Sequence, residues 1–150
     1  MNVVETIRRH FAFLESEYGF KIKKRRNDRH TPFVRYVADN VGVLVQYDVR
    51  DACFDASVYQ LDDGQFPERN GYVVTRAGYS LNNIIYLDVP SAMVASQYGY
   101  DEGDERATLE GNAQEVARKL KQYAVDFLQG DFERGPAVRT AVQEMLAARK

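Results

Sequence analysis

The sequence predicts an α+β fold: an N-terminal helix, an antiparallel β-meander of four to five strands, and helices at the C-terminal end packed on one sheet face. Three observations lead to this prediction. Apolar residues recur at helical spacing near the N-terminus, alternate with polar residues from about residue 20 to residue 60, and return to helical spacing after residue 110. The 150 residues fit one domain, so 1–150 is treated as a single unit.

The first helix is predicted from an apolar stripe at Val4, Ile7, Phe11, Leu14 and Tyr18. Asn2 can cap its start, with Glu5 three residues later in the reciprocal position of a capping box. Gly19 supplies the left-handed residue that commonly ends a helix.

Four strands are predicted from alternation over residues 20–25, 33–38, 41–47 and 52–59. Asp39-Asn40 between the second and third strands is typical of a tight hairpin turn. Short loops join each strand to the next, so a meander order is expected. A fifth strand over 72–75 is a weaker prediction, because turn signals surround it.

The C-terminal helices are predicted to begin at Ser80, at Asn112 and after Pro136. Pro90 must end or kink the first of them, and residues 91–98 can form another short helical turn. Asn112 with Glu115 repeats the capping pattern, and the helix it starts is expected to end near Gly130.

Several protein classes are disfavoured by composition. Cys53 is the only cysteine, which predicts no internal disulfide and fits a reducing compartment. Apolar runs are far shorter than the roughly 20 residues of a membrane-spanning helix. The N-terminus does not resemble a secretory signal. We therefore expect a cytoplasmic protein that does not span a membrane.

Catalytic motifs give little support to an enzyme. The sequence contains no nucleophile elbow, no phosphate-binding glycine loop and no His-Glu-x-x-His pair. His10 and His30 are its two histidines, so few side chains are available as a general base. A calcium loop at residues 101–105 lacks the required ligand pattern. No cofactor and no metal site are predicted.

An enzyme or small-ligand binder stays open as the alternative function. Carboxylates that could form a glycosidase-like or metal-dependent site occur at Asp48, Asp51, Asp55 and Asp62. In this alternative, a pocket lies between the sheet and the C-terminal helices, and Asp51, Asp55 or His10 supplies its polar groups.

Charge and tyrosine distribution favour a protein-binding role. The overall charge of −2 hides a basic first third and an acidic middle, with three Lys/Arg against eleven Asp/Glu over residues 51–110. The basic cluster at residues 21–29 is divided between two strand faces, and the acidic chain disfavours a nucleic-acid partner. Tyrosines concentrate in the acidic middle, and tyrosine is favoured at interfaces. The predicted contacts to a basic partner are Asp62, Asp63, Tyr72, Tyr98, Tyr100, Asp101 and Asp104.

Three segments carry a resemblance: Phe13-Leu14-Glu15 to Tyr18-Gly19-Phe20, Tyr47-Asp48-Val49-Arg50, and Tyr123 to Phe127-Leu128-Gln129-Gly130-Asp131. In this layout the chain resembles small bacterial proteins of unassigned activity, some of them associated with toxin-immunity systems. The resemblance implies a cytoplasmic bacterial protein that neutralises a partner by binding it. The leading hypothesis is a non-enzymatic, immunity-like binding module with an acidic aromatic surface. A homodimer is a third alternative.

Overall fold

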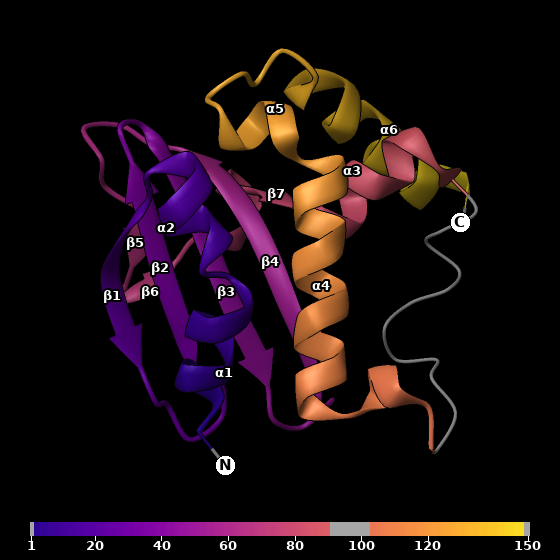
Figure 1. The fold of residues 1–150 in the computed structure, drawn as a ribbon. Coiled ribbons are helices and arrows are strands. Elements are labelled where there is room, and N and C mark those ends of the chain that lie inside the picture. Colours follow the sequence, from indigo (N-terminus) through magenta and orange to yellow (C-terminus); the bar gives the residue numbers. More distant parts are fainter. Residues whose placement is uncertain (1, 91–102, 149–150) are drawn as a thin grey trace.

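The fold is built around one antiparallel sheet, shown by a computed structural model that describes residues 2–90 and 103–148 (Figure 1). Its strand order is β1-β2-β3-β4-β7, so the predicted meander is confirmed for the first four strands. The five strands are β1 (Lys21–Arg26), β2 (Phe33–Ala38), β3 (Val41–Asp48), β4 (Cys53–Gln60) and β7 (Tyr79–Ser80).

The fifth strand of the sheet differs from the sequence prediction. Tyr72–Val73 does form a strand, β6, but it pairs with β5 (Glu68–Arg69) in a separate two-stranded ribbon. The fifth position of the main sheet is taken by β7, which pairs with β4. The 3₁₀-helix η1 (Thr75–Ala77) connects β6 to β7. The turn-forming residues around the predicted strand fold it back on itself before the chain rejoins the sheet.

The predicted first helix is two helices, α1 (Val3–His10) and α2 (Phe13–Tyr18). Asn2 caps α1 as expected, because its side chain accepts a hydrogen bond from the Glu5 backbone. Gly19 ends α2 with φ 74°. A tight turn at residues 11–12 interrupts the helical hydrogen bonds, yet Phe11 and Leu14 on either side are both fully buried.

The later helices are α3 (Leu81–Asp88), η3 (Glu105–Ala107), α4 (Leu109–Tyr123), α5 (Val125–Leu128) and α6 (Gly135–Ala148). The predicted start of α4 was wrong by one turn, since Thr108 caps it by accepting from the Gly111 backbone. Asn112 instead lies buried inside the helix, where its Oδ1 accepts a 2.8 Å hydrogen bond from the Phe54 backbone on β4. The predicted helical turn at 91–98 falls outside the described residues.

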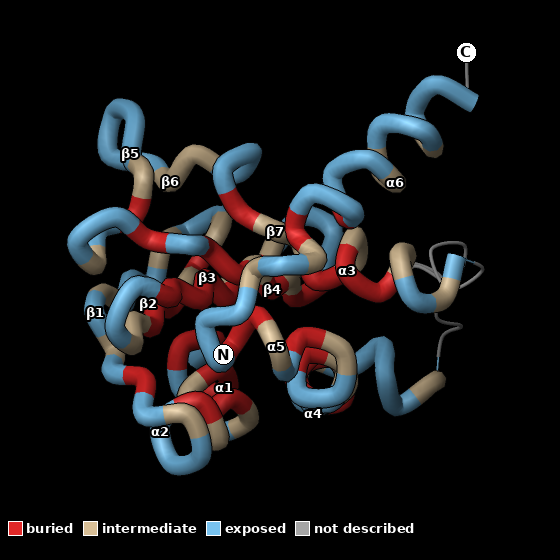
Figure 2. Tube along the Cα trace, turned by 90° about the horizontal axis from the view of Figure 1, so that it is seen from above, coloured by how far each residue is buried: buried red, intermediate tan, exposed pale blue. Residues whose placement is uncertain are grey.

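Helices α1, α2 and α4 cover one face of the sheet, and the β5–β6 ribbon lies against the opposite face (Figures 1 and 2). Alternation along the strands divides the apolar residues between two clusters. The main core joins Val43, Phe54 and Val58 to the helices. A smaller cluster on the opposite face consists of Leu44, Tyr59, Leu61 and Phe66.

The small cluster requires a glycine. A Cβ placed on Gly42 in β3 would lie 2.6 Å from the Phe66 ring, too close for any side chain to fit without a shift. Phe66 therefore packs directly on the strand backbone, which anchors the loop after β4. None of the helices in the described parts of the chain has the length and apolar character needed to cross a bilayer.

Candidate functional site

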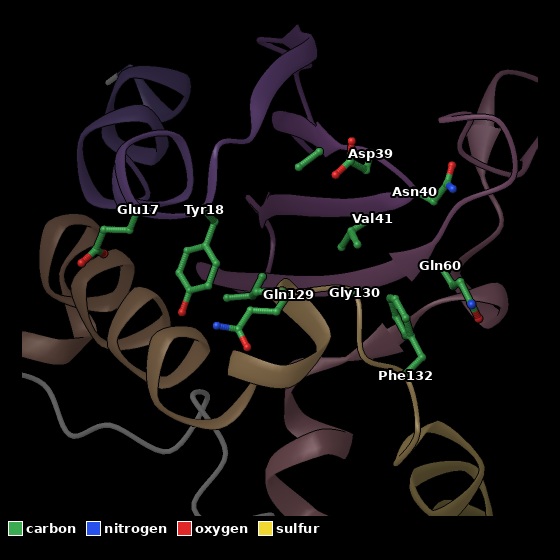
Figure 3. A pocket seen from close by; sticks show the side chains of 11 residues that line it. Glu17, Tyr18, Asp39, Asn40, Val41, Gln60, Gln129, Gly130 and Phe132 are labelled. Atoms are coloured by element: carbon green, nitrogen blue, oxygen red, sulfur yellow. The ribbon is translucent and has the colours of Figure 1, made fainter.

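The candidate site is a pocket at one end of the sheet, where the β2–β3 turn, the end of β4, the end of α2 and the loop after α5 meet (Figure 3). Its volume is about 700 Å³. It is lined by Glu17, Tyr18, Ala38, Asp39, Asn40, Val41, Gln60, Leu128, Gln129, Gly130 and Phe132. We refer to this cavity as the sheet-end pocket.

Turns hold the lining residues in place. Asp39 adopts φ 51° in the two-residue turn between β2 and β3, a conformation that short polar residues tolerate well. The Asn40 carbonyl accepts a 2.6 Å hydrogen bond from the Leu61 backbone, which ties this turn to the chain leaving β4. Gly130 takes φ 89° on the helical side of the pocket.

The sheet-end pocket combines acidic and aromatic side chains. Glu17 and Asp39 line it together with Tyr18 and Phe132, and no described lining residue is basic. Figure 3 shows the labelled side chains arranged around the opening, with Glu17 on the helical side and Asp39 on the strand side. Lys121 lies outside the lining and pairs with Glu17 at 2.9 Å.

More carboxylates surround this end of the molecule. Asp62 and Asp63 are exposed on the loop after β4. The Cβ position of Gly64 in that loop is 3.7 Å from the Asp39 carbonyl oxygen, so the loop lies beside the β2–β3 turn. Asp131, next to the lining residue Gly130, is also exposed. We call this set the acidic rim, defined as Glu17, Asp39, Asp62, Asp63 and Asp131.

The structure brings only part of the predicted contact set together. Asp62 and Asp63 belong to the acidic rim, whereas Tyr72 is 74% exposed on β6 and lines a different cavity. Asp104 caps η3 beyond the other end of α4, where a hydrogen bond from the Arg106 side chain lowers the pKa of Asp104 to about 2. Tyr98, Tyr100 and Asp101 lie outside the described residues.

Sequence reasoning missed Glu17, Tyr18 and Phe132. The sequence did contain one local signal: Gly19 was correctly predicted to end the helix, which places Glu17 and Tyr18 at the helix terminus. Their meeting with Asp39 depends on how α2 and α5 are placed against the sheet. That placement has no signature within any one segment.

The polar residues of the enzyme alternative do not meet. His10 lies on α1, where its Nε2 is 2.6 Å from Glu110 on α4. Asp55 lies on the opposite face of the sheet, and Asp51 lies in the β3–β4 turn, where its backbone donates to Asp48. Within the described ranges, no three His, Cys, Asp or Glu side chains are grouped closely enough to hold a metal ion.

The chain was compared with protein families, curated proteins and solved structures. No family model, no curated protein and no solved structure matches the chain.

Proposed function

We propose that the protein is a non-enzymatic binding module that accepts basic side chains of a protein partner at the sheet-end pocket. One observation carries the proposal: two carboxylates from separate segments, Glu17 and Asp39, line a cavity with aromatic residues and with no basic lining residue among those described. Exposed Asp62, Asp63 and Asp131 lie on the loops next to it. A lysine or arginine entering it would meet the carboxylates of Glu17 and Asp39 and the aromatic rings of Tyr18 and Phe132.

Each part of this surface has a physical role in binding. The acidic rim speeds association with a basic surface and helps to set the orientation of the partner. Tyr18 and Phe132 offer apolar contact area, and aromatic side chains in partly enclosed positions commonly dominate binding energy. An immunity-like role, in which this contact blocks a toxin, is the version that the resemblance implies.

The test is the affinity of the double variant Asp62→Asn with Asp63→Asn for a partner captured at low salt and then purified. Asparagine tolerates the φ of 54° found at position 63, so the loop is expected to keep its shape. We expect affinity to fall by about tenfold and the dependence on salt to become shallower.

The matched control removes two carboxylates elsewhere, with Asp51→Asn in the β3–β4 turn and Glu105→Gln on η3. This control should bind as the wild type does. Equal affinity and salt dependence for the Asp62/Asp63 variant and the control would contradict the proposal, as would a purified partner with an acidic contact surface.

A further inference from the structure

A second cavity lies on the sheet face opposite α4, between the β1–β2 loop and the β5–β6 ribbon. Its volume is about 490 Å³. Strand residues Phe33, Arg35 and Leu44 form its floor, since all three point to the face that carries the small apolar cluster. Tyr72 on the ribbon and His30 in the β1–β2 loop contribute to its walls.

Arg35 is the unusual residue of this cavity. Its side chain is only 6% exposed, although arginine is seldom buried without full pairing. Rings of Phe33 and Phe66 lie 5.1 and 5.6 Å from its guanidinium carbon. Nη1 donates to Glu68, while the buried Nε has no hydrogen-bond partner among the described residues.

An unpaired N–H donor on a buried cation is costly, because its water is lost without replacement. The guanidinium can pair with a carboxylate through two parallel hydrogen bonds. Arg35 donates to Glu68 through Nη1 alone, so the guanidinium keeps at least one N–H without an acceptor among the described residues. A carboxylate that enters through the cavity and takes the place of Glu68 at Nη1 would pair with a guanidinium already held against the rings of Phe33 and Phe66.

Glu68 is the weaker partner of the pair. It is 42% exposed and sits on a two-residue strand that pairs only with β6. Because Glu68 is exposed and does not belong to the small apolar cluster, its side chain can turn away from Arg35 without disturbing that cluster. The hydrogen bond from Arg35 lowers the pKa of Glu68, which keeps this carboxylate ionised and able to compete with another anion.

The remaining lining selects the kind of anion. Asp28, Asp48 and Asp55 line the cavity together with Arg26 and Arg35, and these carboxylates repel a singly charged carboxylate less than a doubly charged phosphate. Asp28 and Asp48 accept backbone hydrogen bonds in the adjoining turns, which keeps them in place. Phe33, Leu44 and Val73 supply apolar surface.

We propose that this cavity binds a small organic monocarboxylate with an apolar or aromatic body, whose carboxylate pairs with Arg35 in competition with Glu68. The body of the ligand lies against Phe33 and Leu44 under the β5–β6 ribbon. This site is separate from the sheet-end pocket and does not depend on the function proposed for it.

The test uses benzoate as the probe and the full chain as the protein. Titration is followed by calorimetry and by the NMR resonance of the Arg35 Nε–H, with inorganic phosphate in a parallel arm. We expect saturable benzoate binding that shifts this resonance, and no comparable effect of phosphate. Glu68→Gln should tighten benzoate binding by about tenfold, because the competing charge is removed.

Arg35→Lys should weaken binding by about tenfold or more, since lysine cannot form the planar pair. Arg69→Gln alters the neighbouring ribbon residue, which does not line the cavity, and should bind as the wild type does. If Arg35→Lys does not fold, the proposal is tested by the affinity of Glu68→Gln for benzoate and by the Nε–H resonance of the wild type. An unmoved resonance, weaker binding by Glu68→Gln, or preference for phosphate would overturn the proposal.

Discussion

The tyrosines of this chain differ widely in burial. Tyr36 and Tyr59 are almost fully buried, and neither hydroxyl has a hydrogen-bond partner among the described residues. Burial raises the pKa of Tyr36, and it raises the pKa of Tyr59 to about 12. Tyr72, by contrast, is 74% exposed. The alternation of the strands predicts which face a tyrosine takes, but not whether that face is covered.

The Tyr36 hydroxyl is predicted to cost stability. Tyr36→Phe keeps the ring in the main core and removes a polar group that is buried without a partner. The free energy of unfolding should rise by about 1 kcal/mol. Chemical denaturation measures it, with exposed Tyr72→Phe as the control that should change little. A clear loss of stability in Tyr36→Phe would show that its hydroxyl has a favourable interaction.

At the scale of elements, strands were predicted more accurately than helix ends. Strand positions 33–38 were predicted to the residue, because period-two alternation runs through the whole strand. The start of α4 was misplaced because Asn112 has the residue type and spacing of a cap. Its side chain binds the backbone of a strand 58 positions away, which no local pattern reveals.

The Asn112 contact predicts a large effect on stability. Asn112→Ala would leave the Phe54 N–H buried and without its acceptor, so the free energy of unfolding should fall by about 2 kcal/mol. Gln114→Ala on the exposed face of the same helix is the control for helix propensity and should have little effect. Thermal and denaturant unfolding measure both variants. A change of similar size in the two would count against the role given to Asn112.

At the scale of the whole molecule, the arrangement of layers decides where charges meet. The acidic rim draws on residues 17, 39, 62, 63 and 131, and only Asp62 and Asp63 were singled out from the sequence as partner contacts. The remainder join them because α2 and α5 end at the same edge of the sheet as the β2–β3 turn. The sequence predicted that this protein has an acidic surface for a basic partner. The place where the carboxylates gather depends on how the helices pack on the sheet.

Glu110 joins the first helix to the fourth, and it predicts how stability depends on pH. Its carboxylate pairs with Arg9 at 2.5 Å and with His10 at 2.6 Å. Hydrogen bonds from Arg9 and then His10 lower the pKa of Glu110 from 4.5 to about 2. A depressed carboxyl pKa stabilises the folded state above pH 4.5, and this contribution is lost as the pH falls toward 2.

Glu110→Gln should therefore flatten the fall in unfolding free energy across this acidic range. Denaturant titrations at several pH values measure the slope, and Glu144→Gln on the exposed side of α6 provides the control, which should keep the wild-type slope. An unchanged slope in Glu110→Gln would mean that the contacts between α1 and α4 do not depend on this charge.

The sheet separates two apolar clusters, because its strand residues alternate between the two faces and the Phe66 ring closes against Gly42 on one of them. The main core lies between the sheet and the helices, and the small cluster lies on the opposite face with the ribbon. Substitutions in one cluster should add approximately independently to those in the other, because the two clusters share no residue. A substitution in the small cluster should therefore leave the packing of the helices on the opposite face unchanged.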